Sequence, residues 1–149
     1  MFIIDRVLLI IDRIVALICG IYVSIKRGIS YHNYQKKLYS DLVYQFNELV
    51  ISDEEDVPLI NNVDTDIFIR LKLVTKRVSL LEATIHTIDC FSEMHKETLR
   101  HTWLPSKYLS TAKAGLDECC TWRKNLREDL VTCHEVRDVL FNCVKDKVD

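Results

Sequence analysis

Four side chains with metal-binding chemistry follow one another at helical spacing in the middle of the chain. Glu82, His86, Asp89 and Glu93 are separated by four, three and four positions, so a helix would place them in one strip. Carboxylates and an imidazole arranged in this way could hold a transition metal. The Glu-x-x-His pairs of helical di-iron centres are absent, however, because none of the five histidines has Glu three residues before it. We therefore expect this strip to be a solvated helix surface that holds no metal.

The six cysteines form no recognisable metal or disulfide pattern. Cys133 and Cys143 are separated by nine residues, which is half of the twin CX9C pattern of disulfide-stapled helical hairpins, but the second half is missing. No CxxC pair is present to favour zinc. Residues ten positions apart on one helix lie about 15 Å apart, too far for a disulfide. We expect buried free thiols, because four cysteines fall on or beside helix packing faces: Cys19, Cys119, Cys133 and Cys143.

The sequence contains no motif that is typical of catalysis or of nucleotide binding. The patterns GxGxxG, GxxxxGK[ST] and GxSxG are all missing, and three glycines could hardly form a loop around a phosphate. A net charge of -2 gives no electrostatic footprint for nucleic acid. We expect a protein that is not an enzyme, requires no cofactor and binds no nucleic acid.

The scarcity of glycine and proline predicts long helices. Three Gly and two Pro in 149 residues are far below the usual shares of about 7% and 5%. Sheets and hairpins need many such residues in their turns, whereas helices joined by few connections do not. The expected fold class is all-α, a helical bundle or a long antiparallel helical hairpin.

The clearest helical pattern covers residues 67–88. Apolar residues alternate spacings of four and three, which is typical of the a/d seam of a coiled coil or antiparallel bundle. Thr65 or Asp66 can cap the first turn, because a side-chain oxygen there accepts a backbone N–H. The seam, which faces either the core or a partner, consists of Ile67, Leu71, Val74, Val78, Leu81, Ile85 and Ile88.

The remaining segments divide the chain into two parts. Residues 1–28 form an apolar N-terminal helix that ends near a glycine, and residues 29–149 form the helical bundle. Within the bundle the stretch 52–66 combines an acidic run with Pro58, which cannot continue a helix in the usual way. We expect residues 52–66 to be a mobile acidic loop.

The apolar N-terminal helix is interrupted by charges that return every seven positions. Asp5–Arg6, Asp12–Arg13, Cys19–Gly20 and Lys26–Arg27 share one heptad phase, so on a helix they form a single narrow stripe. The rest of the helix surface is almost wholly Ile, Val and Leu. A helix with this pattern belongs in lipid or inside a layer of other helices.

The cost of membrane insertion can be compared with its gain. Residues 2–25 are long enough to span a bilayer, but Asp12 and Arg13 near the midplane cost about 2.5 to 3.5 kcal/mol each. The strongly apolar residues, at about 0.3 to 0.6 kcal/mol each, offset much of that cost. Insertion is favourable if Asp12 and Arg13 find partners on another helix. The residues that we expect to insert are Ile3, Leu8, Ile11, Asp12, Arg13, Val15, Leu17 and Ile21.

Three other interpretations of the N-terminal apolar segment can be compared with its sequence pattern. A buried helix of a soluble bundle would show the same composition. A signal peptide fits less well, because the first thirteen residues are too apolar for a basic leader and no small-x-small cleavage site follows Val23. An interfacial helix fits less well, because such helices carry a broad polar face.

These observations leave three functional hypotheses. The first is a non-catalytic, membrane-associated helical subunit or adaptor that scaffolds partner proteins, with the compartment left open. Lys26, Arg27, Lys36 and Lys37 would then keep the bulk of the chain on the cytoplasmic or equivalent side. The second is a soluble four-helix bundle whose N-terminal helix is released to insert into a membrane, as in pore-forming or cell-death domains. The third is an obligate oligomer that covers the apolar helix with copies of itself or with a partner, where the Asp–Arg stripe would supply ion pairs between helices.

Overall fold

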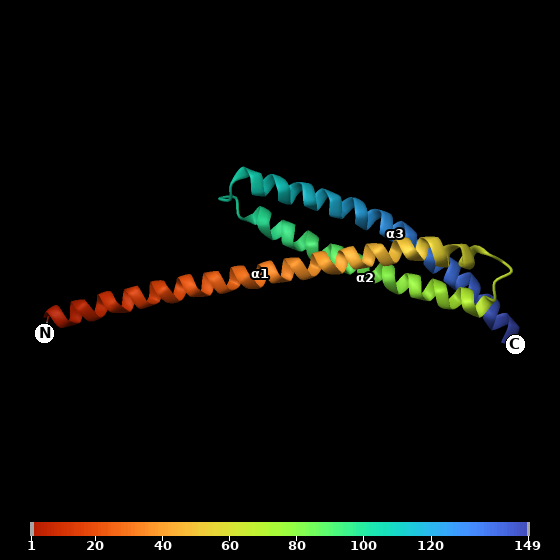
Figure 1. The fold of residues 1–149 in the computed structure, drawn as a ribbon, viewed down its shortest axis with the longest axis horizontal. Helices are drawn as coiled ribbons and strands as arrows, with labels where there is room; N and C mark the ends of the chain where they lie inside the picture. The colour runs from red at the N-terminus through yellow and green to blue at the C-terminus, as the bar shows by residue number, and fades with distance from the viewer. Residues whose placement is uncertain (1, 149) are drawn as a thin grey trace. The chain divides into compact units, whose positions relative to one another are not determined.

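A computed structural model describes the backbone of residues 2–148, while the side chains of residues 2–5, 8, 9 and 24 lie outside the described part. The chain forms three α-helices, α1 (Phe2–Asn61), α2 (Ile67–Arg100) and α3 (Ser106–Val148) (Figure 1). Its contacts divide it into two compact units, Met1–Lys37 and Leu38–Asp149. The prediction of an all-α fold is confirmed.

The second unit is an antiparallel bundle of three helices. α2 and α3 lie side by side and run in opposite directions (Figure 1), and the part of α1 that begins at Leu38 contributes Leu42, Leu49 and Ile60 to the same core. Phe46 of α1 meets Trp122 of α3 edge to face, with ring centroids 5.5 Å apart. The buried residues of α3 are spaced seven apart, as in a coiled coil. They are Ala112, Cys119, Leu126, Cys133 and Leu140.

The apolar seam of α2 lies in this core. Leu81 and Ile88 are completely buried, and Val74, Val78 and Ile85 are buried beside them. The first two seam residues, Ile67 and Leu71, are half-buried and pack against the core from its edge. All seven positions therefore face the inside of the bundle.

α1 continues through two places where the sequence pattern predicts an interruption. The first is Gly28, where the pattern predicts the end of the apolar helix. One glycine inside a helix costs about 1 kcal/mol, too little to break a helix with apolar or amphipathic residues on both sides. The second is the acidic stretch, of which residues 52–61 are helical. The prediction of a loop over residues 52–66 is wrong for its first two thirds, and only residues 62–66 connect α1 to α2.

Contacts with α2 explain why the acidic stretch is helical. Lys76 Nζ lies 3.5 Å from a carboxylate oxygen of Asp56, which is itself largely buried. Near the helix end, Arg70 Nε donates a hydrogen bond to the Ile60 carbonyl at 2.7 Å, which satisfies an acceptor that has no partner within the helix. Pro58 is in the last turn, where the one hydrogen bond that it cannot donate, to the carbonyl of Glu54, lies close to the end of the helix.

Local hydrogen bonds stabilise the two connections between the helices, residues 62–66 and residues 101–105. Asp66 caps α2 as predicted, because its carboxylate accepts from the backbone N–H groups of Phe68 at 2.9 Å and Ile69 at 3.3 Å. Between α2 and α3, the carbonyl of Pro105 accepts from the N–H of Tyr108 at 3.0 Å. Short, well-bonded turns of this kind hold neighbouring helices antiparallel.

Candidate membrane-anchoring site

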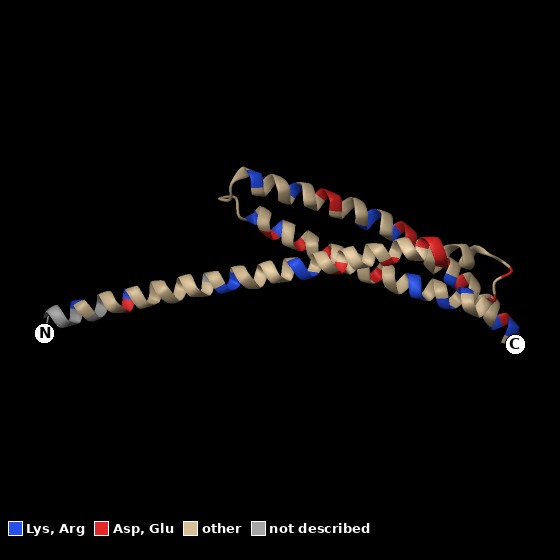
Figure 2. Ribbon diagram, in the orientation of Figure 1, with Lys and Arg blue, Asp and Glu red and all other residues tan. Residues whose placement is uncertain are grey.

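The apolar part of α1 exposes its large side chains in every direction. All side chains that are described between residues 6 and 37 are exposed, with Leu17 66% and Ile18 60% accessible. By length and composition, α1 is the one helix in the described part of the chain that could cross a membrane, with a mean hydropathy of 1.4 in its most apolar window. Figure 2 shows the same segment as long uncharged stretches separated by a few charged turns.

The residues that we expect to insert can be placed individually. Ile11, Val15, Leu17 and Ile21 are exposed apolar side chains in this segment. The side chains of Ile3 and Leu8 lie outside the described residues.

Asp12 and Arg13 are also exposed. Neither of them takes part in an ion pair among the residues that the structure describes.

A basic and aromatic segment follows the apolar one. Tyr22, Lys26, Arg27 and Tyr31 are all exposed, and residues 14–40 contain no Asp or Glu. Tyrosine and basic side chains are enriched where a membrane helix leaves the hydrocarbon, because their polar ends reach the headgroups while their stems stay apolar. The segment thus has the order of a membrane anchor, apolar first and then amphipathic.

The strip of possible metal ligands on α2 is divided among separate partners. Asp89 lies 2.9 Å from Arg123 Nε of α3, and Glu82 lies 3.8 Å from His134 Nε2 of α3. Glu93 pairs with Lys96 on its own helix. Within the described residues no group of three or more His, Cys, Asp or Glu is placed to hold a metal ion. The strip is not only a solvated surface, since Asp89 joins α2 to α3 through Arg123.

Arg77 is a buried charged residue that the sequence pattern does not identify. Its guanidinium donates to Ser52 Oγ at 2.9 Å and to a carboxylate oxygen of Asp53 at 2.5 Å, and its side chain is 8% exposed. The charge pattern held a signal for this contact, because an acidic run precedes residues 62–66 and four basic residues follow them. Those basic residues are Arg70, Lys72, Lys76 and Arg77.

All six cysteines are free thiols, but they differ in burial. Cys119 and Cys133 are buried in packing faces as predicted, and burial raises the pKa of both thiols. The prediction is wrong for Cys19 and Cys143, which are exposed. Cys143 lies beyond the last buried residue of α3, and Cys19 belongs to the exposed apolar segment.

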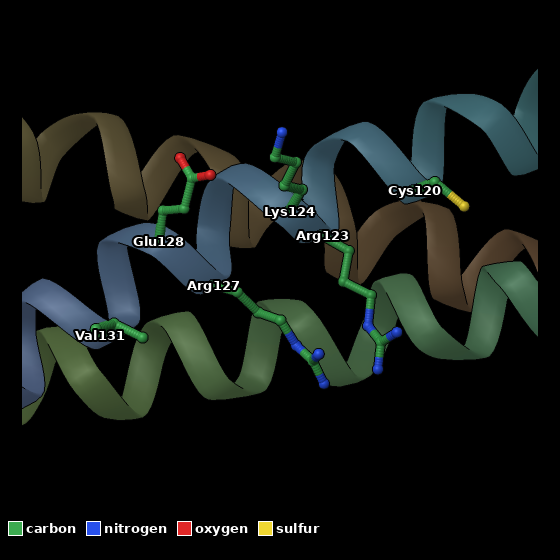
Figure 3. A pocket seen from close by; sticks show the side chains of 6 residues that line it. All are labelled: Cys120, Arg123, Lys124, Arg127, Glu128 and Val131. Carbon is green, nitrogen blue, oxygen red and sulfur yellow. The ribbon is translucent and has the colours of Figure 1, made fainter.

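A surface hollow of about 580 Å³ lies along the middle of α3. Figure 3 shows that Lys124 and Glu128 point away from α2, while the side chains of Arg123 and Arg127 extend across it. Apart from Cys120 and Val131, the side chains that line the hollow are charged. Most of the surface of the hollow is nevertheless apolar, because the Arg and Lys residues line it largely with their aliphatic stems.

Comparison of the chain with protein-family models, with curated proteins and with solved structures finds no match. We therefore infer the function from the chemistry of the residues themselves. The feature that is least typical of a water-soluble domain is the exposed apolar segment of α1, between Val7 and Ile25.

Proposed function

We propose that this protein is a non-catalytic, membrane-associated helical subunit or adaptor, anchored by residues 2–25 and presenting its bundle to partner proteins. The observation that carries the proposal is the exposure of apolar side chains all round α1 between Val7 and Ile25. Soluble proteins rarely expose contiguous apolar patches larger than a few hundred Å², because water in contact with apolar surface is unfavourable. Lipid covers such a surface on all sides at once.

The dimensions of the segment support the same proposal. A helix over residues 2–25 rises about 35 Å, compared with a hydrocarbon thickness of about 30 Å. Tyr22, Lys26 and Arg27 then lie at one boundary, where aromatic and basic side chains are favoured. The cost of placing Asp12 and Arg13 in hydrocarbon opposes insertion of the helix.

The bundle supplies the surface for partners. The hollow on α3 combines charged side chains with the exposed apolar side chain of Val131. A charged rim beside apolar contacts is typical of protein interfaces. A non-catalytic role is supported by the ion pairs that already engage Asp89 and Glu93.

Carbonate extraction and vesicle flotation of the full chain test the anchor. We expect the full chain to stay with membranes and a variant that lacks residues 1–27 to be released. The double substitution Ile14→Lys with Ile18→Lys should also release the chain, because two more charges would enter hydrocarbon. Val131→Lys with Val139→Lys is the matched control, since it adds the same charges to the exposed surface of the bundle and should leave retention unchanged.

Two outcomes would overturn the proposal. One is release of the full chain by carbonate, and the other is unchanged retention of the Ile14→Lys, Ile18→Lys variant. If the full chain is soluble and removal of residues 1–27 abolishes cooperative unfolding, the apolar helix belongs to a soluble core.

A further inference from the structure

One face of the apolar segment differs from the rest. Ala16 is four residues after Asp12 and three after Arg13, and Gly20 is four after Ala16. At about 100° per residue, Ala16 points between the two charged side chains, about 40° from Asp12 and about 60° from Arg13. This face, which we call the Asp12–Gly20 face, has small residues along its middle, a carboxylate on one side and a guanidinium on the other.

Both features of the Asp12–Gly20 face favour contact with another helix in lipid. Charged side chains inside a membrane almost always face protein or water rather than acyl chains. Small residues four apart let two helix backbones approach closely, as in small-xxx-small contacts. At Gly20 a side-chain carbon would meet nothing within 4 Å, so a neighbouring backbone can come close there.

The face is complementary to itself only in one orientation. When two copies are related by a two-fold axis parallel to the helices, the carboxylate side of each lies against the guanidinium side of the other. Asp12 of one copy then meets Arg13 of the other at nearly the same depth, and the pair forms twice. An antiparallel copy centred on Ala16 would place Asp12 against Gly20, which offers no counter-charge.

We infer that the Asp12–Gly20 face binds the same face of a second copy in the membrane, forming a parallel dimer with two Asp12–Arg13 pairs. The inference rests on the proposed function, since it applies to helices in lipid. A partner with a single charge would leave Asp12 or Arg13 unpaired, whereas a second copy pairs both.

Disulfide crosslinking in membranes tests the inference on the full chain. In a background where Cys19, Cys90, Cys120 and Cys143 are replaced by Ser, the Ala16→Cys variant is oxidised with copper phenanthroline in vesicles at high lipid excess. We expect a disulfide-linked dimer. Ile18→Cys is the matched control, because it is equally exposed but lies on the opposite side of the helix, and it should crosslink little.

Charge variants in the Ala16→Cys background test the pairing itself. Asp12→Arg alone and Arg13→Asp alone should each lose the crosslink, and a mixture of the two should regain it between differently tagged copies. If either variant leaves the membrane, Asp12→Asn with Arg13→Gln replaces it, with an expected loss of about fivefold in dimer fraction.

The outcomes separate the dimer from the anchor. Equal crosslinking of the Ala16→Cys and Ile18→Cys variants, no crosslink in either, or full crosslinking of Asp12→Arg alone would each overturn the dimer while flotation still supports the anchor. Loss of flotation by the parent chain would overturn both.

Discussion

Cys119 and Cys120 are adjacent residues in opposite environments. Cys119 is buried and its thiol pKa is raised by burial, whereas Cys120 is exposed beside the hollow on α3. Because the thiolate is the reactive form, we expect Cys119 to be alkylated at least about tenfold more slowly than Cys120 at neutral pH. The measurement compares iodoacetamide labelling of the Cys119→Ser and Cys120→Ser variants of the full chain in detergent, in a background where Cys19, Cys90, Cys133 and Cys143 are replaced by Ser. If Cys119 is labelled at the same rate in the folded chain as after adding denaturant, its burial is contradicted.

His95 gives the bundle a pH-dependent stability. It stacks near Phe91 and its ring lies 2.6 Å from where a side-chain carbon at Gly115 would be, so α2 and α3 are close there. Burial lowers the pKa of His95, and the nearby Glu118 opposes this with a smaller effect. The unfolded chain therefore binds the proton more readily, and His95 makes folding less favourable as the pH falls below its unfolded pKa of about 6.5.

The His95→Gln variant tests this dependence. Between about pH 8 and about pH 5.5 we expect the free energy of unfolding of the parent to fall more than that of the variant. The other titrating groups are common to both proteins, so the comparison isolates His95. Urea titrations of the full chain in detergent, followed by circular dichroism, measure the difference. Parallel pH profiles would show that protonation of His95 has no cost in the folded bundle.

At the residue level the sequence predicted the role of apolar positions better than that of charged ones. Leu81 and Ile88 follow from periodicity alone, because a position in an a/d pattern faces the core whatever its neighbours are. Arg77 could not be placed in this way. Its burial depends on Ser52 and Asp53, which are on another helix, and a one-dimensional pattern does not show which turns of two helices meet.

At the level of helices, the seam of α2 supplies the most fully buried side chains of the bundle core. Leu81 is completely buried among side chains of the core. We expect Leu81→Ala to lower the free energy of unfolding by about 3 kcal/mol, through lost burial and the cavity left behind. Ser79→Ala, two residues away on the exposed side, should change it by less than about 0.5 kcal/mol. Urea unfolding of both variants checks this, and a small effect of Leu81→Ala would show that the seam is loosely packed.

The end of α1 is the element that the sequence alone does not predict. Its acidic residues and Pro58 are typical of a connector, and a helix there is favourable only because Arg70, Lys76 and Arg77 of α2 meet it. Tertiary contacts therefore override local propensity in this stretch. The apolar seams carry no such dependence, which is why the all-α fold could be predicted.

Asp53 provides a direct test of that contact. Asp53→Ala removes one acceptor from the buried guanidinium of Arg77, and we expect a loss of about 1 to 2 kcal/mol in unfolding free energy. The carboxylate is 58% exposed, so water can partly replace it and the loss stays below that of a fully buried pair. Glu54→Ala changes an exposed neighbour of the same charge and should have little effect. Equal stability of the two variants would mean that Asp53 does not support Arg77.

At the scale of the whole molecule, charge is distributed unevenly along the chain. Between residues 13 and 40 every charged side chain is basic, whereas the part of α1 that begins at Leu38 carries only acidic side chains and α2 and α3 mix both signs (Figure 2). In a membrane protein such a basic segment beside the apolar one fixes orientation, because basic residues stay on the cytoplasmic or equivalent side. The same segment would also be attracted to anionic lipids on that side.

Neutralising this segment should disturb the orientation of the chain. We expect the bundle of the parent to be accessible to protease from the cytoplasmic or equivalent face of sealed vesicles. Replacing Lys26, Arg27, Lys36 and Lys37 with Gln removes the basic side chains nearest the membrane, so a fraction of chains should insert in the opposite orientation and become protected. Four matched substitutions on α3, at Lys124, Arg127, Lys145 and Lys147, should leave the orientation unchanged, since those residues lie far along the sequence from the anchor. If both sets leave protease accessibility unchanged, the basic segment does not set the orientation, and the bundle itself resists translocation.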